Sequence, residues 1–176
     1  MEYRIEYASP LGAITLLAED DALTALYFSG QKHAPAASKG EPSLKTPPVL
    51  RDAVRWLDLY FRGRNPGFTP NLAIKGTPFR RAVCRIMLTI PYGETTTYGA
   101  IAERIAAERG IPRMSAQAVG GAVGRNPISL IIPCHRVVGT GGSLTGYGAG
   151  LDRKVKLLEL EGIKSGTFFW PGKKRG

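Results

Sequence analysis

Residues 97–124 read TYGAIAERIAAERGIPRMSAQAVGGAVG, and they carry the clearest structural signal in the chain. Thr97 and Ser115 each precede a helix-forming stretch, residues 98–109 and 116–124, and hydroxyl side chains at such positions accept hydrogen bonds from first-turn amides. A Gly-Ile-Pro tripeptide separates the two stretches. The pattern predicts a helix-turn-helix with the second helix in the recognition position. Such helix pairs also occur in ordinary cores, so the pattern alone leaves both interpretations open.

Further helices are expected on both sides of this pair. Thr77 precedes Pro78, and a capping residue followed by proline predicts a helix, here one that runs to Ile90. Another helix is expected over residues 153–160, where the apolar residues recur at helical spacing. Residues 77–176 should therefore form a mainly helical domain.

The first part of the chain has a different pattern, because its apolar residues occur in short runs separated by turn sequences. This pattern predicts an antiparallel meander of three strands. A surface loop is expected over residues 30–48, and apolar residues every three or four positions predict a helix from Val49 to just before Gly63. The expected strands cover residues 3–7, 13–18 and 23–28.

Residues 63–76 are rich in Gly, Pro and Asn and mark the expected domain boundary. The expected fold class is α+β, with a strand-rich structural domain at residues 1–76 and a helical, winged-helix-like helix-turn-helix domain at residues 77–176. The composition, 43% hydrophobic and 22% charged, excludes a disordered chain. The sequence shows no membrane-spanning run and no signal-peptide pattern, so we expect a cytoplasmic protein.

Positive charge is concentrated in the second domain. The chain has 24 Lys and Arg residues against 14 Asp and Glu residues, a net charge of +10. Residues 76–176 hold 15 of the basic and 6 of the acidic residues. Nucleic acid is the first partner to consider, because a basic surface binds polyanions with release of counterions. From charge alone, a solvated basic surface is an equally good interpretation.

The expected recognition helix consists mostly of glycine and alanine, so its side chains are very small. It contains Ala118, Gly120, Gly121, Ala122 and Gly124, and each helical glycine costs about 1 kcal/mol relative to alanine. Close approach to another helix is one explanation. Close approach to a nucleic-acid groove is the other, and the basic flanks of this helix favour it.

Cys134 is the candidate nucleophile. It follows the apolar run ISLIIP and precedes His135 and Arg136, which are neighbours able to favour a thiolate. In extended backbone, adjacent side chains point to opposite faces, so His135 cannot take the Cys134 proton directly unless a turn or a water intervenes. We therefore expect a relay rather than a direct pair. Glu161, at the end of the expected helix 153–160, is the nearest carboxylate that could orient His135.

Cys84 has a different setting, because it lies among apolar residues at helical spacing and is expected to be a small buried hydrophobe. Two cysteines and two histidines without CxxC or HxxxH spacing are too few for a disulfide scaffold or a metal site. Glycine-rich phosphate-binding patterns are also missing, so no cofactor is expected.

These motifs together resemble the O6-alkylguanine-DNA alkyltransferases. The resemblance covers residues 77–162 and is most specific at the active-site signature. It is carried by Ile90–Tyr98 (IPYGETTTY), Ala118–Gly121 (AVGG), Asn126-Pro127, Pro133–Val138 (PCHRVV), Gly146–Gly148 (GYG) and Leu151–Glu161.

The resemblance implies a monomeric suicide repair protein that moves an alkyl group from O6 of guanine in duplex DNA, with O4 of thymine as a second target, to its own cysteine. Cys134 would be the acceptor, His135 would deprotonate it through a water, and Glu161 would polarise His135. Asn126 would brace the segment that carries the cysteine. The alkylated base would contact the main chain of Val137, the hydroxyl of Tyr147, the region of Gly148 and the wall near Val123.

The resemblance also implies base flipping, because the lesion lies inside the base stack. Tyr98 would crowd the phosphate beside the target, and the helix with Ala118, Gly120 and Gly121 would enter the minor groove. A core aromatic is the alternative interpretation of Tyr98. The chain departs from the best-known members at Gln117, where they have arginine. Glutamine can hydrogen-bond the orphaned cytosine but lacks the charge and planar face of arginine.

Two other classes of function are alternatives to an alkyltransferase. Alkyltransferase-like proteins recognise the lesion without transferring anything, and they carry another residue, commonly tryptophan, where this chain has Cys134. A helix-turn-helix regulator would bind a defined operator as a dimer, and the sequence offers neither a dimerisation helix nor a fused regulatory domain.

Overall fold

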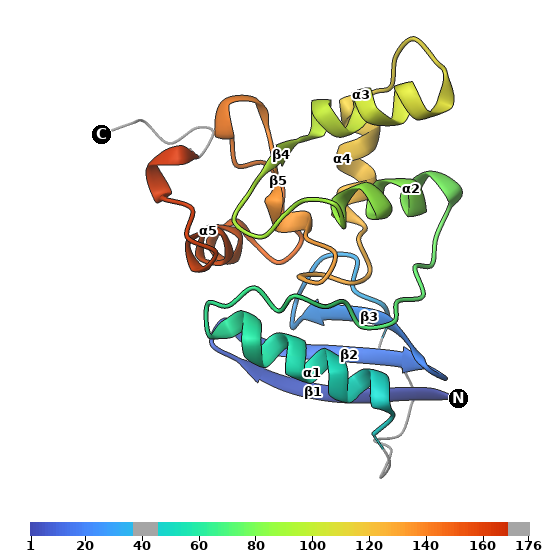
Figure 1. The fold of residues 1–176 in the computed structure, drawn as a ribbon, viewed down its shortest axis with the longest axis vertical. Helices are drawn as coiled ribbons and strands as arrows, with labels where there is room; N and C mark the ends of the chain where they lie inside the picture. The colour runs from blue at the N-terminus through green and yellow to red at the C-terminus, as the bar shows by residue number, and fades with distance from the viewer. Residues whose placement is uncertain (37–45, 169–176) are drawn as a thin grey trace.

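The computed structural model describes residues 1–36 and 46–168. Its first part is an antiparallel three-stranded sheet in the order β1-β2-β3, formed by β1 (Glu2–Ser9), β2 (Gly12–Glu19) and β3 (Ala22–Phe28). Helix α1 (Pro48–Phe61) packs across one face of this sheet (Figure 1). The meander and the helix confirm the sequence prediction. The central residues of the expected loop 30–48 lie outside the described residues.

The outer edge of strand β3 is covered by two segments from other parts of the chain. Leu23 exchanges backbone hydrogen bonds with the stretch 71–73, at 2.8 and 2.9 Å. Leu26 does the same with the stretch 127–129: its N–H donates to the Pro127 carbonyl at 3.0 Å, and its carbonyl accepts from the Ser129 N–H at 2.9 Å. Edge pairing of this kind satisfies backbone groups that would otherwise be open. It also attaches the segment before Cys134 to the sheet.

Within the described residues, the second part contains four α-helices, and three of them begin with the side-chain caps that the sequence predicts. Thr77, Thr97 and Ser115 accept hydrogen bonds from the amides of Arg80, Ala100 and Ala118, at 3.2, 3.0 and 3.1 Å. Helices α3 and α4 pack together as the expected helix-turn-helix (Figure 1). The helices are α2 (Pro78–Met87), α3 (Tyr98–Arg109), α4 (Ala116–Gly124) and α5 (Leu151–Leu160).

Two boundaries differ from the prediction. Helix α2 ends at Met87 and not at Ile90, because the chain tightens there: the Thr89 amide and hydroxyl both bond to the Ile86 carbonyl, at 3.0 and 2.7 Å. Helix α5 begins two residues before the predicted start. A short parallel pair, β4 (Thr96–Thr97) with β5 (Val137–Val138), joins the start of α3 to the segment after Cys134.

The expected extended backbone at Cys134 is wrong. The preceding apolar run is irregular, with Leu130 in the left-handed region at φ 69°, and Cys134–Arg136 forms a 3-10 turn. The run is almost completely buried, so its backbone bends to place successive apolar side chains in the core instead of alternating between core and solvent.

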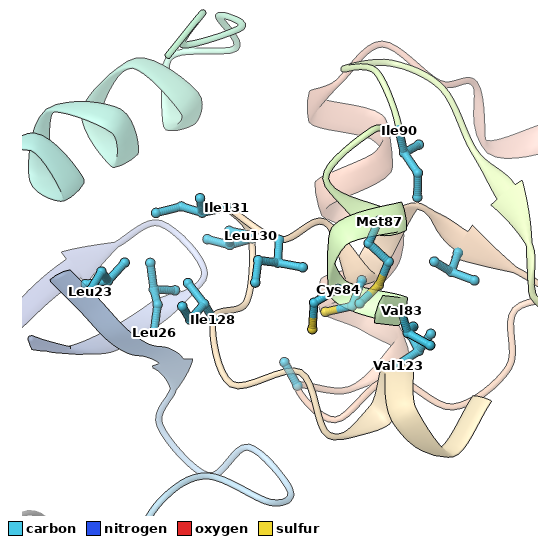
Figure 2. Close-up of a cluster of buried hydrophobic side chains, with 14 of the residues drawn as sticks. Leu23, Leu26, Val83, Cys84, Met87, Ile90, Val123, Ile128, Leu130 and Ile131 are labelled. Carbon is cyan, nitrogen blue, oxygen red and sulfur yellow. The ribbon is translucent and has the colours of Figure 1, made fainter. Parts of the chain in front are cut away.

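One continuous hydrophobic core joins the two parts of the chain. Figure 2 shows Leu23 and Leu26 of the sheet beside Ile128, with Val83 and Cys84 of α2 on the other side. Cys84 is 1% exposed, which confirms its expected role as a buried core residue. The Cys134 segment is therefore fixed between the sheet and the helices.

Candidate active site

Glu161 contacts His135, the chain neighbour of Cys134, although the two contacting residues come from different elements. Cys134 and His135 lie in the 3-10 turn after the buried apolar run, and Glu161 is the residue that ends helix α5. The His135 Nε2 atom lies 2.5 Å from Glu161 Oε2, and both side chains are completely buried. The structure thus brings together the histidine and the carboxylate that the sequence could only list as candidates.

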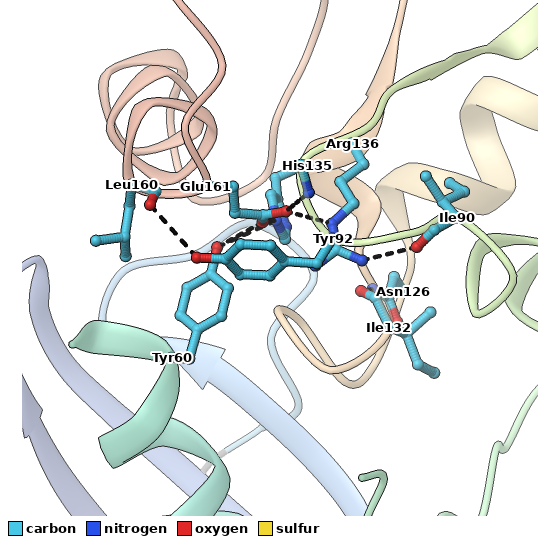
Figure 3. A network of polar contacts seen from close by, with 10 residues as sticks. Tyr60, Ile90, Tyr92, Asn126, Ile132, His135, Arg136, Leu160 and Glu161 are labelled. Atoms are coloured by element: carbon cyan, nitrogen blue, oxygen red, sulfur yellow. Dashed lines mark hydrogen bonds and ion pairs between the residues drawn. The ribbon is translucent and has the colours of Figure 1, made fainter. Parts of the chain in front are cut away.

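Four donors surround the Glu161 carboxylate (Figure 3). Its Oε1 atom accepts from Arg136 Nε at 2.7 Å and from the Gly93 amide at 2.9 Å. Its Oε2 atom accepts from His135 Nε2 and from the Tyr60 hydroxyl, the latter at 2.7 Å. Gly93 has a φ of 80°, and a Cβ atom there would lie 3.3 Å from the Glu161 carbonyl, so this close approach requires glycine.

The electrostatics keep Glu161 charged and His135 neutral. Burial alone would raise the pKa of Glu161, but the hydrogen bond from His135, the charge that His135 carries once it is protonated at low pH, and the charge of Arg136 lower it to about 2. Burial lowers the pKa of His135, and Glu161 offsets this effect only in part. A charged Glu161 can only accept, so the proton on neutral His135 resides on Nε2. The Nδ1 atom is then an acceptor, and it is buried without a partner among the described residues.

Cys134 is a buried thiol, 5% exposed. Burial raises its pKa, and hydrogen bonds from Asn126, Ser129 and Tyr147 and the charge of Lys154 oppose that effect. Since burial dominates, the resting group is the neutral thiol. A base must remove its proton before the sulfur can act as a nucleophile, and the free Nδ1 of His135 can serve as that base.

Asn126 makes both contacts that bracing requires. Its Nδ2 donates to the Ile132 carbonyl at 2.8 Å, and its Oδ1 accepts from the Ile128 amide at 3.0 Å. These bonds tie the two ends of the loop before Cys134 to one buried side chain, which is 6% exposed.

Lys154 is a site residue that the sequence reasoning missed. It is fully buried in helix α5, its Nζ donates to the Val137 carbonyl at 2.6 Å, and burial lowers its pKa to about 8. Its charge favours the Cys134 thiolate. A signal existed in the sequence, because this lysine occupies an inward position of a helix, three residues before the buried Leu157.

The expected substrate-binding residues are in different settings. Tyr147 has a buried hydroxyl that interacts with the Cys134 sulfur, a weak acceptor, and it has no conventional hydrogen-bond partner among the described residues. The Gly148 carbonyl accepts from the Lys32 amide at 3.0 Å, so the first domain fixes that loop. The Val137 carbonyl accepts from Lys154. Val123 is buried in the hydrophobic core (Figure 2), the same cluster that contains Cys134 and Val137.

Four of the five expected DNA-contacting residues line one cavity. A cavity of about 820 Å³ opens between α3, α4 and the loop 139–146. Tyr98 hydrogen-bonds to Thr145 in this cavity and is close enough to Cys134 for the two groups to interact electrostatically. Ala118 is exposed on the same helix as Gln117. The residues lining the cavity include Tyr98, Gln117, Gly120, Gly121, Thr145 and Gly146.

Internal packing does not explain the glycines of α4. A Cβ atom at Gly121 or Gly124 would meet no atom of the described residues within 4 Å, and one at Gly120 would make an ordinary contact of 3.7 Å with Tyr98. Of the two explanations that the sequence left open, close helix packing fails at two of the three glycines. The space beside Gly121 and Gly124 allows an external partner to approach the backbone of α4.

Within residues 1–36 and 46–168, no helix combines the length and apolar character needed to cross a bilayer. In the same ranges, His, Cys, Asp and Glu side chains form no group that could hold a metal ion.

The second helix of the helix-turn-helix has mostly small side chains, and a buried cysteine with a His–Glu pair lies nearby. This combination defines a DNA-binding protein that carries its own nucleophile. Two family descriptions match the chain: "6-O-methylguanine DNA methyltransferase, ribonuclease-like domain" at residues 3–74 and "6-O-methylguanine DNA methyltransferase, DNA binding domain" at residues 78–163. The chain belongs to the 6-O-methylguanine DNA methyltransferase family. The matches meet next to the expected domain boundary at residue 76.

Proteins of similar sequence match this chain over most of its length. The methylated-DNA–protein-cysteine methyltransferase of Mycolicibacterium paratuberculosis is 45% identical over 161 residues, which is 92% of both chains. The protein of that name from Methanosarcina acetivorans is 42% identical and covers 92% of this chain and 99% of its own length. The crystal structure of Mycobacterium tuberculosis O6-methylguanine methyltransferase matches with a TM-score of 0.77 at 43% identity, covering 92% of this chain and 93% of that chain.

Proposed function

We propose that this protein repairs O6-alkylguanine in duplex DNA by moving the alkyl group irreversibly to the sulfur of Cys134, and that O4-alkylthymine is a second substrate. The observation that carries the proposal is the buried Cys134 thiol beside a neutral histidine whose second ring nitrogen is held by a charged carboxylate. The similar M. tuberculosis protein has a structure in complex with DNA, which supports the same type of substrate.

The chemical step is an in-line displacement at the alkyl carbon. The thiol proton moves through a bridging water to His135 Nδ1, and Glu161 stabilises the resulting imidazolium. The sulfur forms a bond to the alkyl carbon, the carbon–O6 bond breaks, and its electron pair stays on the guanine. Tyr147 donates a proton to a guanine ring atom, and the proton held by His135 then restores the Tyr147 hydroxyl. The net products are S-alkylcysteine and guanine, so each molecule reacts once.

The helix-turn-helix delivers the base to this site. The small side chains of α4 let its backbone lie close to the minor groove. Tyr98 crowds the phosphate next to the lesion. Flipping the nucleotide costs a few kcal/mol, which contacts in the protein must offset. Gln117 fills the vacated position in the stack and hydrogen-bonds the orphaned cytosine.

The test is stoichiometric labelling with duplex DNA that contains O6-methylguanine. Peptide mass spectrometry should find one methyl group per molecule, on the peptide that contains Cys134. Cys134→Ala should take up none, whereas Cys84→Ala, the matched control, should be labelled fully. Methyl on Cys84, or tight lesion binding without any transfer, would refute the assignment and would favour a recognition protein.

Cytoplasmic location and a monomeric state stay predictions of the sequence. Cell fractionation and light scattering during size-exclusion chromatography test them.

A further inference from the structure

Tyr60 lies in helix α1, far from the DNA-binding part of the chain, yet its hydroxyl reaches the His135–Glu161 pair. The hydroxyl donates to Glu161 Oε2 at 2.7 Å and lies 3.3 Å from His135 Nε2 (Figure 3). The side chain is completely buried. The strand-rich first domain therefore places one polar atom inside the relay that the second domain forms.

Aromatic packing fixes the direction of this hydroxyl. The Tyr60 ring stacks on Trp56, one helical turn earlier, with centroids 5.1 Å apart and an angle of 10° between the planes. Tyr92 and His135 meet the ring edge-on, both at 6.2 Å. With these contacts on three sides, the ring has little freedom to turn its hydroxyl away from Glu161.

The two contacts of the hydroxyl differ in strength. A hydrogen bond of 2.7 Å to a charged carboxylate is a strong one, and the approach of 3.3 Å to a ring nitrogen is weak. Burial and the nearby Glu161 charge raise the pKa of Tyr60 well above its ordinary value, so the hydroxyl keeps its proton and remains a donor. Its main effect is therefore on Glu161, where it shares Oε2 with the His135 N–H.

We propose that Tyr60 is a positioning residue that sets the basicity of His135 through Glu161. By donating to Oε2, it withdraws part of the negative charge that faces the imidazole and holds the carboxylate in one orientation. Arg136 and Lys154 also lower the pKa of His135, and with the Tyr60 hydroxyl in place His135 stays neutral, with a free Nδ1, to a lower pH than with these charged groups and Glu161 alone. This inference rests on the proposed function, since it concerns the base that activates Cys134.

The test is the pH dependence of alkylation by free O6-benzylguanine, which requires neither DNA binding nor base flipping. Tyr60→Phe keeps the ring and removes the hydroxyl. Without that donor, the acid limb of the rate profile should move up by about half to one pH unit, so the rate at low pH falls about threefold to tenfold. The rate at high pH should stay near that of the parent protein. NMR titration of His135 should show the same displacement.

Tyr7→Phe is a matched control, because Tyr7 also donates to a carboxylate of the α1 region, Asp58, at 2.7 Å, but on the surface. It should leave the profile unchanged. A second variant tests the sign: 3-fluorotyrosine at position 60 has a more acidic hydroxyl and should move the acid limb to lower pH. This variant keeps the shape of the side chain if Tyr60→Phe fails to fold.

An equal loss of rate at every pH in Tyr60→Phe would mean that the residue acts only in packing, and it would overturn the proposal. An unchanged profile would do the same. Failure of the proposed function looks different, because the parent protein itself would then show no alkylation of Cys134.

Discussion

Glu161→Gln should destabilise the protein by an amount that depends on pH. The carboxylate accepts four hydrogen bonds in a fully buried position, one of them from the buried Arg136. Glutamine keeps the shape but not the charge, and it leaves the guanidinium without its counter-ion. Breaking a buried ion pair in this way costs about 3–5 kcal/mol.

The pKa of Glu161 gives an independent value for the same loss. It falls from an ordinary value of 4.5 to about 2 in the folded protein, and this difference corresponds to about 3 kcal/mol. Since the folded pKa is the lower one, the stabilisation is fully present above about pH 4.5 and is lost as the pH falls through 2. Both values lead us to expect a loss of about 3 kcal/mol at neutral pH.

The assay is urea denaturation followed by tryptophan fluorescence at a series of pH values. The difference in the free energy of unfolding between the parent protein and Glu161→Gln should be about 3 kcal/mol at pH 7 and should shrink toward pH 2–3. Glu159→Gln, on the exposed side of the same helix, should show little difference at any pH. A constant difference between the parent and Glu161→Gln across this range would refute the reasoning.

Three further substitutions test other parts of the site. Gly121→Ala should stabilise the protein by about 0.5–1 kcal/mol, because a Cβ atom there meets nothing within 4 Å, and should weaken binding to duplex DNA in a fluorescence titration; unchanged binding would contradict the groove interpretation. Gln117→Arg should modestly accelerate repair of duplex DNA and leave the reaction of free O6-benzylguanine unchanged, whereas equal effects on both would show that Gln117 supports the pocket. Lys154→Met removes a charge that favours the thiolate, so the pKa of Cys134, measured by iodoacetamide reactivity against pH, should rise; a fall would refute that role.

The local features of the fold were predictable because each depends on neighbours in the chain. The caps at Thr77, Thr97 and Ser115 place the helix starts, since a hydroxyl side chain acts on amides two or three residues away. The three strands follow from short apolar runs with turns between them. The turn at Cys134 was not predictable in this way, because burial on several sides and not local propensity bends the apolar run before it.

The sequence by itself indicated the candidate nucleophile, its neighbouring histidine and the helix-turn-helix, because these are carried by motifs of contiguous residues. Only the tertiary structure decided what surrounds them. The Tyr60–Glu161 and Gly93–Glu161 hydrogen bonds join residues 101 and 68 positions apart. The pairing of Leu26 with the segment before Cys134 links the sheet to the site. Such contacts depend on how whole elements pack, and packing is set by the shape and burial of many side chains at once, which no local pattern in the chain contains.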